Sequence, residues 1–461
     1  MELATHGAGW DACATVEDAG YVLLRLTITA PAPDGAARTY THVLTSRGHD
    51  AYLELFAALS RRFGTRTPGS RAGLAAGQAE VPGLRALLTH NVSTDILYGY
   101  GDPAVLHVGD RYHLVVTSND APQSFPILSA RILSDWRLSG FAFPHGAKPP
   151  WAAEDGCGAE YWAPEIHKVG DGYLLCFAAR ETDGTLGIGL GIAPVPTGAF
   201  HPDPEPVLTG GVVDPHLHVG EHGCTLFWKE DSNDRWPSLL SEAIQCHPAL
   251  AAHLFADQSD RRTARLAGLI WPWVRTLTPM ERFQAQQPLI EAAAADFPAF
   301  RRRAEQLCAG GLLPKAMLAG MRTTIRAQPL SNARMLTDAP TVILENDLLW
   351  EGHVVEGVWL WRGKDAWYLF YAANDFATAN YGIGVARGPT PLGPFAKQPL
   401  PLLRAANGWY GLGHPSVARA PDGRPHLFFH GYRPEALGYK AFRALLTVPL
   451  RFEGGHVTAG D

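Results

Sequence analysis

One motif returns five times along the chain, and it limits what this sequence can fold into. In each copy a short polar or small residue precedes Pro or Gly, an apolar strand follows, and a turn leads into a second strand that ends in aromatic or apolar residues. Gly101 to Val116 is the clearest copy, with Gly109-Asp110 at its turn. We call the residue that opens each copy its lead residue; the five lead residues are Asp102, Ala163, Asp214, Glu356 and His414.

The spacing of the copies indicates a repeated arrangement of small sheets. The steps between successive lead residues are 61, 51, 142 and 58 residues. Repeats of about 40 to 60 residues, each with several short strands, are typical of a β-propeller, whose blades send their first strands along a central channel. The sequence therefore predicts an all-β fold, a five-bladed β-propeller over residues 96–461, with the lead residues converging on one funnel.

The long third step coincides with a change in sequence character. From about Leu239 to Met321 the strand pattern gives way to a region rich in Ala, Leu and Arg. Thr278-Pro279-Met280-Glu281 is typical of a helix start, because it places a capping Thr, a Pro at the first helical position and a Glu at the third. We expect a helical insertion over residues 239–321 within blade three, which would serve either as a lid beside the channel or as a subunit interface.

Residues 1–95 do not carry the repeat. Alternating apolar and polar residues from Tyr21 to Ala30, the turn signal Pro33-Asp34-Gly35 and a returning strand from Thr39 predict a hairpin. Apolar residues at helical spacing from Asp50 to Phe63 predict a helix. We expect a small N-terminal α+β module of unknown role, for packing or oligomer formation or else for sugar binding, with a linker over residues 64–77.

Composition narrows the range of partners. The formal net charge of -6 over 461 residues gives no basic excess, so we expect no nucleic-acid partner. A hydrophobic content of 46% with 18% charged residues fits a globular protein. No run of 18 apolar residues and no signal-peptide pattern are present, so we expect a cytoplasmic protein that does not enter a membrane.

Three of the five lead residues are carboxylates, namely Asp102, Asp214 and Glu356. Glycoside hydrolysis needs one carboxyl group that gives a proton to the leaving oxygen and one carboxylate that activates water. A third carboxylate raises the pKa of the acid by like-charge repulsion. Asp-Pro and Glu-Gly also begin strands at turns, but three carboxylates at one repeat position favour a catalytic role.

These motifs together resemble glycoside hydrolase family 43, whose members are five-bladed propellers that act with inversion on arabinose- and xylose-containing glycans. The resemblance covers about residues 96 to 450 outside the helical insertion, and it implies that Asp102 is the general base, that Asp214 sets the pKa of the acid and orients it, and that Glu356 is the general acid. The matching segments are Gly101-Asp102-Pro103-Ala104-Val105, Tyr161-Trp162-Ala163-Pro164-Glu165-Ile166, Asp214-Pro215-His216-Leu217, Val355-Glu356-Gly357 and Gly413-His414-Pro415-Ser416-Val417.

Further residues are candidates for binding. Aromatic side chains offer flat apolar faces to a sugar, although an aromatic residue in a blade strand more often packs between blades; the candidates are Trp162, Phe125, Trp151 and Trp359. Arg180 and Arg419 are candidates to reach a sugar hydroxyl or Asp214. In the resembled family a histidine at the place of His414 contacts a central ion, often calcium, or its water shell, so a structural Ca²⁺ at the axis is an open possibility, and no cofactor is required.

The sequence therefore predicts an inverting glycoside hydrolase that removes terminal arabinofuranosyl or xylosyl residues, and less readily galactosyl residues, from oligosaccharides. One alternative is a glycoside phosphorylase or transferase on a similar propeller. Such an enzyme needs Arg, Lys or His side chains for phosphate beside the acid, and the sequence around Glu356 shows no such cluster. The other alternative is a non-catalytic sugar-binding propeller. The helical insertion or the N-terminal module would form the contact of a homo-oligomer.

Overall fold

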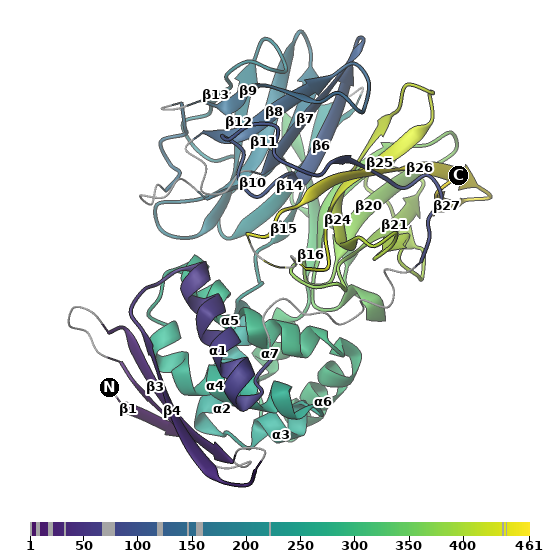
Figure 1. Cartoon of the computed structure of the whole chain (residues 1–461). Helices are drawn as coiled ribbons and strands as arrows, with labels where there is room; N and C mark the ends of the chain where they lie inside the picture. Colours follow the sequence, from purple (N-terminus) through teal and green to yellow (C-terminus); the bar gives the residue numbers. More distant parts are fainter. Residues whose placement is uncertain are drawn as a thin grey trace. The chain divides into compact units, whose positions relative to one another are not determined.

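The computed structural model divides the chain into two compact units (Figure 1). Unit one contains Met1–Ser70 and Ser232–Arg322, and unit two contains Arg71–Asp231 and Thr323–Asp461. Among the described residues, no helix has the length and apolar character that crossing a membrane requires. The structure describes residues 2–5, 10–16, 22–31, 34–66, 79–117, 123–144, 147–153, 160–220, 223–435, 438 and 440–461.

Unit two is built from antiparallel sheets, and its described residues form five of them. This confirms the predicted predominance of β-structure. The strands, sheet by sheet, are β6 (Gly101–Val108), β7 (Arg111–Thr117), β8 (Ser124–Ala130) and β9 (Arg137–Phe143); β10 (Tyr161–Val169), β11 (Gly172–Arg180), β12 (Leu186–Ala193) and β13 (His201–Pro202); β14 (Val212–Gly220), β15 (Gly223–Glu230), β16 (Thr324–Ser331), β17 (Met335–Leu336) and β18 (Thr341–Glu345); β19 (Val355–Arg362), β20 (Trp367–Ala373), β21 (Gly382–Gly388), β22 (Ala396–Lys397) and β23 (Leu403–Arg404); β24 (Tyr410–Arg419), β25 (Pro425–Tyr432), β26 (Ala444–Glu453) and β27 (His456–Ala459).

The first strands of these sheets contact one another in order. β6 contacts β10, β10 contacts β14, β14 contacts β19, β19 contacts β24, and β24 returns to β6. The chain before the first sheet adds a strand, β5 (Arg85–Leu88), which pairs with β26 of the last sheet. Because of this pairing, residues 79–95 belong with unit two, and the expected boundary of the N-terminal module at residue 95 is wrong.

Each first strand carries a bulge at the same place, and the residue that opens the bulge has a positive φ. These residues are Asp102, Ala163, Asp214, Gly357 and His414. The expected lead residue of the fourth copy, Glu356, is therefore off by one position. Gly357 takes the left-handed conformation there, with φ of 53°, and glycine pays no steric penalty for it.

Unit one joins the N-terminal segment to the helices. The hairpin of β3 (Leu24–Pro31) and β4 (Ala37–Leu44) belongs to a four-stranded sheet with β1 (Glu2–Thr5) and β2 (Asp11–Thr15). The Tyr21 and Pro33 positions of the predicted hairpin lie outside the described residues, as do residues 67–77 of the predicted linker. The helices are α1 (His49–Phe63), α2 (Arg235–Cys246), α3 (Leu250–Leu254), α4 (Gln258–Val274), α5 (Pro279–Ala294), α6 (Phe297–Ala309) and α7 (Lys315–Gly320).

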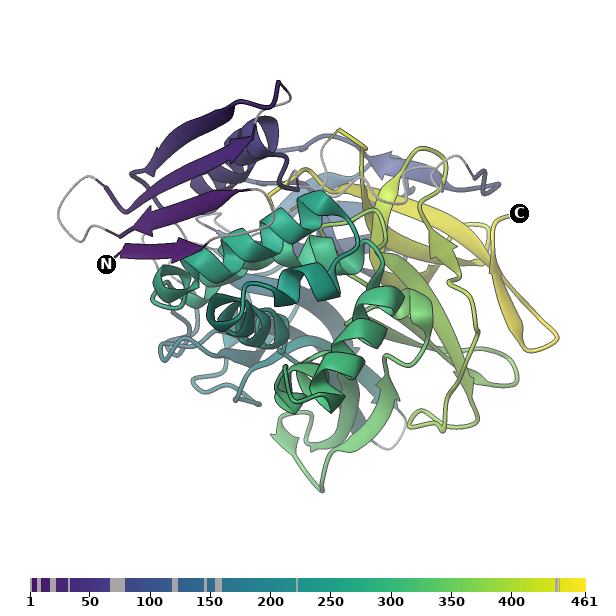
Figure 2. The same cartoon turned by 90° about the horizontal axis from the view of Figure 1, so that it is seen from below.

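One hydrophobic core in unit one joins parts that the sequence treated as separate modules. Leu26 of β3, Phe56 of α1 and Trp273 of α4 are all buried in it. Arg66 donates to Asp260 of α4 at 2.7 Å, which ties the end of the N-terminal segment to the same helix. Figures 1 and 2 show the sheet and the helices packed together within this unit. The N-terminal segment and the helical segment therefore form one folded unit, and the N-terminal module is not separate.

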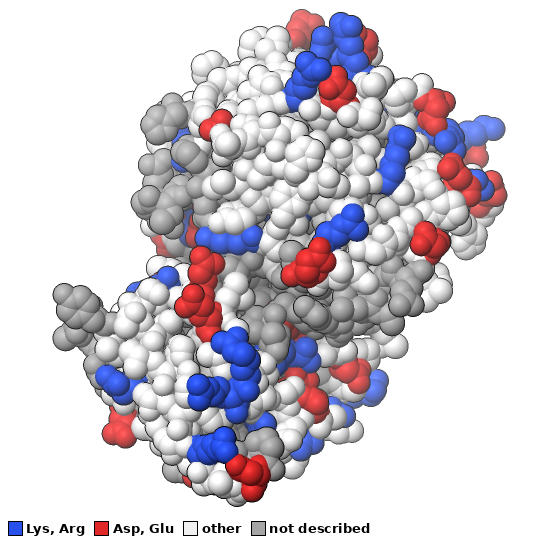
Figure 3. Space-filling view, viewed as in Figure 1, with Lys and Arg blue, Asp and Glu red and all other residues white. Residues whose placement is uncertain are grey.

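Charge is spread thinly over the visible surface of unit two. Figure 3 shows acidic and basic side chains there in small mixed groups, separated by uncharged surface. This agrees with the small net charge of the sequence.

Candidate active site

Asp102 opens the bulge of β6, and its carboxylate is held by donors from three directions. Arg443 Nη1 donates to Oδ1 at 3.1 Å, and Thr117 Oγ1 donates to Oδ2 at 2.6 Å. His414 Nδ1 lies 3.4 Å from Oδ1. The backbone N–H of Asp102 donates to His430 Nδ1 at 3.2 Å. Both carboxylate oxygens are thus fixed in direction.

These neighbours decide the charge of Asp102. Burial alone would raise the pKa of this carboxyl group. The positive charge of Arg443, together with His414 and the hydrogen bond from Thr117, outweighs burial and holds the pKa of Asp102 below its ordinary value. Asp102 is therefore ionised at neutral pH, as a group that accepts a proton from water must be.

Asp214 and Glu356 lie together in a second part of the site. The backbone N–H of Gly357 donates to Asp214 Oδ2 at 3.2 Å, which brings the start of β19 to β14. Burial and the negative charge of Glu356 raise the pKa of Asp214 to about 7, against the opposing effect of His414 and Lys229. Two carboxyl groups that interact this strongly lose their protons as a pair. Asp214 therefore keeps its proton to a much higher pH than Asp102 does.

Two donors hold Glu356. Tyr381 O–H donates to Oε1 at 2.9 Å, and Lys229 Nζ lies 3.0 Å from Oε2. The sequence around Glu356 shows no cluster of cationic side chains, but one cation, Lys229, reaches it from elsewhere in the chain. Lys229 comes from β15, 127 residues earlier in the numbering, so no local pattern around Glu356 reveals it.

Five residues of the site were not predicted from the sequence, namely Arg443, Tyr381, Thr117, Lys229 and His430. Two glycines, however, mark places where side chains from distant parts of the chain reach the site. A Cβ atom on Gly101 would lie 1.8 Å from Arg443 Cζ, and one on Gly413 would lie 1.8 Å from Tyr381 Cε1. Gly101 and Gly413 precede the bulges of β6 and β24, just as Glu356 precedes the bulge of β19. A glycine before a bulge is thus the signal that another side chain reaches the site there.

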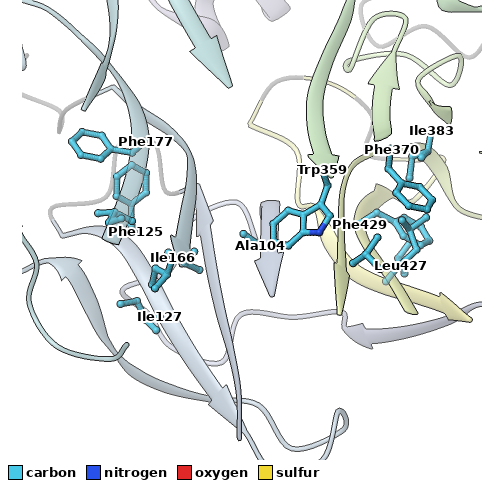
Figure 4. Close-up of a cluster of buried hydrophobic side chains, with 14 of the residues drawn as sticks. Ala104, Phe125, Ile127, Ile166, Phe177, Trp359, Phe370, Ile383, Leu427 and Phe429 are labelled. Atoms are coloured by element: carbon cyan, nitrogen blue, oxygen red, sulfur yellow. The ribbon is translucent and has the colours of Figure 1, made fainter. Parts of the chain in front are cut away.

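The aromatic candidates separate into one that is accessible and three that are not. Trp162 is partly exposed, adjoins Ala163 and has the Arg180 guanidinium 5.6 Å from its ring centre. Phe125 is fully buried and packs against Phe177, as Figure 4 shows.

Trp151 and Trp359 are each only 9% exposed. Trp151 stacks on Phe177, and Trp359 packs against His167 and His216. The expectation of sugar platforms at Phe125, Trp151 and Trp359 is wrong, because packing between sheets covers their faces.

Neither arginine candidate contacts Asp214. Arg180 pairs with Glu160 and donates to the carbonyl oxygen of Gly184. Arg419 donates to the carbonyl oxygen of Gly423 and lies over Trp361. Arg419 ends β24, five residues beyond His414, so the expectation that it reaches the site is wrong.

The side chains around His414 do not supply a set of direct calcium ligands. Calcium takes six to eight oxygen ligands in proteins, whereas His414 offers a nitrogen and both oxygens of Asp102 accept from Arg443 and Thr117. In the part of the chain that the structure describes, the group of three close metal-ligating side chains is Glu165, His167 and His216, and it does not include His414.

The Glu165 group is a hydrogen-bond network. Leu360 N–H donates to Nε2 of His216 at 3.0 Å, so Nδ1 of this ring carries the proton and donates it to Glu165 at 2.9 Å. The ring nitrogen that a metal would need is therefore already protonated. The network ties β10 to β14 and β19.

Comparisons with known proteins relate the chain to glycoside hydrolases. A xylosidase/arabinosidase 43A from Humicola insolens is 34% identical over 79 residues, which are 17% of this chain and 23% of that protein, so the chain spans under a quarter of this relative. A thermostable family-43 glycoside hydrolase of known structure aligns with a TM-score of 0.56 and 22% identity, over 80% of this chain and 96% of that one. An α-L-arabinofuranosidase from Lactobacillus brevis aligns with a TM-score of 0.51 and 15% identity, over 80% of this chain and 95% of that one.

The sequence model of the glycosyl hydrolases family 43 matches residues 96–245 and 315–457, which are more than half of the chain. The match includes Asp102, Asp214 and Glu356, and it leaves out most of the helical segment of unit one. The resemblance seen in the motifs is confirmed, and the chain belongs to glycosyl hydrolases family 43.

Proposed function

We propose that the five sheets of unit two are the blades of a five-bladed propeller and that this enzyme removes terminal arabinofuranosyl or xylosyl residues from oligosaccharides with inversion. The closed order of contacts among the first strands supports the propeller. Asp102 is the general base, Glu356 is the general acid, and Asp214 is a positioning residue beside the acid.

The observation that carries this proposal is the unequal charge of the carboxyl groups. Arg443 keeps Asp102 ionised, while burial and the negative charge of Glu356 raise the pKa of Asp214 to about 7, so a proton is held beside Glu356. Single displacement needs these two states at the same pH, because one group must accept a proton while another donates one.

In the proposed reaction, Asp102 takes a proton from water as the water oxygen bonds to the anomeric carbon. Glu356 gives its proton to the leaving oxygen as the bond between that oxygen and the anomeric carbon breaks. Inversion follows because water attacks from the face opposite the leaving group. Asp214, which accepts from Gly357 N–H, fixes the start of β19 and so the direction of Glu356.

The test is a panel of 4-nitrophenyl glycosides with α-L-arabinofuranosyl, β-D-xylosyl and β-D-galactosyl groups, followed by ¹H NMR of the first sugar released. The expected result is hydrolysis of the arabinofuranoside or the xyloside with inverted anomeric configuration. A retained configuration in the first product contradicts the single displacement.

Lys229 is a cation beside Glu356, so the same experiment should also test the phosphorylase alternative. Its ammonium is 1% exposed and faces Glu356 and Asp214, so its charge serves these carboxyl groups rather than an entering phosphate. The rate is therefore expected to be the same with and without added inorganic phosphate, and a sugar phosphate among the products would favour the alternative.

A further inference from the structure

Lys229 is a buried lysine whose ammonium group ends on a carboxyl group of the site. It lies in β15 opposite Val213, the residue before Asp214, and its side chain is 1% exposed. Burial by itself lowers the pKa of a lysine. Here the charges of Glu356, Asp214 and Asp231 outweigh burial, and the pKa of Lys229 is raised. The ammonium therefore stays charged without contact with solvent.

Several titratable groups surround Glu356 and Asp214, but few carry positive charge. Tyr381 stays neutral because burial and the nearby carboxylates raise its pKa well above the ordinary value. Burial, and then the charge of Lys229, lower the pKa of His353 to about 3, so His353 is neutral as well. The groups from the packed elements are Asp102 of β6, Asp214 of β14, Lys229 and Asp231 at the end of β15, His353 before β19, Tyr381 before β21, His414 of β24, Tyr432 of β25 and Arg443 before β26.

Arg443 and Lys229 contact different carboxylates. Arg443 donates to Asp102, whereas Lys229 Nζ lies 3.0 Å from Glu356 Oε2. The carboxyl group of Asp214 also interacts with Glu356, and its charge has the opposite sign to that of Lys229. Glu356 thus has one cationic neighbour and one acidic neighbour.

We propose that Lys229 is a positioning residue for acid catalysis, which stabilises the Glu356 carboxylate that remains after the proton has passed to the leaving oxygen. This inference rests on the proposed function, in which Glu356 is the acid. The O–H bond of Glu356 breaks, the proton bonds to the leaving oxygen, and the electron pair of the broken glycosidic bond stays on that oxygen. The new carboxylate keeps Lys229 on Oε2 and Tyr381 on Oε1, so no further reactant is needed.

Removing the charge of Lys229 makes proton release harder for the pair of Asp214 and Glu356. The basic limb of the pH profile of kcat/KM reports the loss of the last proton of this pair. An opposite charge within hydrogen-bond distance moves such a titration by about 1 to 3 units. The basic limb of Lys229→Met is therefore expected about 1 to 3 units higher, in the direction opposite to that expected for Asp214→Asn.

The experiment compares native protein, Lys229→Met and Lys397→Met with whichever 4-nitrophenyl glycoside the native protein hydrolyses. Lys397 is the matched control, because it is also a largely buried lysine and it pairs with Glu351, outside the carboxylate site. Its replacement is expected to lower stability and to leave the basic limb in place. The loss of kcat/KM at neutral pH for Lys229→Met is expected to be larger with the methyl glycoside than with the nitrophenyl glycoside, because a poor leaving group needs more proton donation.

If Lys229→Met does not fold, the same measurements are made on Lys229→Gln, which removes the charge and keeps a hydrogen-bond donor. A native basic limb in the folded variant, or an equal shift in Lys397→Met, overturns the proposed role of Lys229. Failure of the proposed function has a different signature: Glu356→Ala would then lose the same factor on every leaving group.

Discussion

Replacing Arg443 with methionine tests the assignment of Asp102 most directly. Arg443 donates to Asp102 Oδ1 at 3.1 Å, and the side chains of Arg443 and Asp102 are 15% and 13% exposed, so solvent screens this pair only weakly. A cation at this distance lowers a carboxyl pKa by about 1 to 3 units. Without it, burial of Asp102 is no longer offset, and the pKa of Asp102 rises.

The expected result is an acidic limb of the pH profile of kcat/KM that lies about 1 to 3 units higher in Arg443→Met than in the native protein. The pH dependence of stability gives a second readout. The pKa of Asp102 is lowered in the folded state, so the stabilisation from its ion pair is present above the unfolded pKa and is lost as the pH falls through the folded pKa. Leaving a buried carboxylate without its partner costs about 3 to 5 kcal/mol, so the free energy of unfolding at pH 7 falls by about that amount.

Both quantities are measured with the same nitrophenyl glycoside and with urea unfolding at pH 7 and at pH 3, since the stabilisation from Asp102 is lost only below the unfolded pKa. Arg424→Met is the control, because Arg424 forms ion pairs with Asp422 and Asp461 that are about half exposed, and such pairs contribute little. A folded Arg443→Met protein whose acidic limb coincides with the native one would refute the assignment of Asp102 as the base.

The remaining predictions concern the same carboxyl groups and the glycine before the last bulge. Glu356→Ala is expected to lose far more activity on methyl glycosides than on nitrophenyl glycosides, whereas Asp102→Ala loses activity on both alike, with external azide as a rescue assay; the reverse pattern contradicts the roles. Asp214→Asn is expected to move the basic limb to lower pH. Because burial raises the pKa of Asp214 to about 7, the native protein loses stability as the pH rises from 4 to 8 and the variant does not, so thermal unfolding should show the variant gaining stability relative to the native protein over this range. Gly413→Ala places a methyl group 1.8 Å from the Tyr381 ring, so kcat is expected to fall, and to fall more for poor leaving groups, as in Glu356→Ala. In the control Gly191→Ala the nearest contact of the new methyl group is 3.3 Å, so the dependence of kcat on the leaving group is expected to stay unchanged.

Much of the local structure could be predicted because local rules determine it. The helix expected from Thr278-Pro279-Met280-Glu281 begins as α5 at Pro279, and Thr278 and Glu281 form its capping box. The hairpin of β3 and β4 follows from strand alternation around a turn. In both cases the sequence signal and the element that it predicts lie within a few residues of each other, so the local sequence is enough for the prediction.

The rest depends on contacts between distant parts of the chain. Nothing near Leu26 indicates that it shares a core with Trp273, so the sequence could not show that the N-terminal segment and the helices form one unit. The same holds for Lys229 and Tyr381, which reach Glu356 from β15 and from the segment before β21. Burial likewise distinguishes Phe125 from Trp162, although both are aromatic residues near first strands.

The displaced position of Glu356 explains how repeated sheets build an unequal site. Asp102 and Asp214 open their bulges with positive φ, and Gly357 does the same in β19, so Glu356 projects from the preceding position. At that preceding position β6 and β24 have Gly101 and Gly413, which admit Arg443 and Tyr381. Asp102, at the bulge of β6, is therefore contacted by Arg443. Glu356, before the bulge of β19, is contacted by Tyr381 and Lys229. The backbone repeats, but the side chains that enter differ from one bulge to the next, so Gly101→Ala, whose Cβ would lie 1.8 Å from Arg443 Cζ, is expected to disturb the hydrogen bond from Arg443 to Asp102.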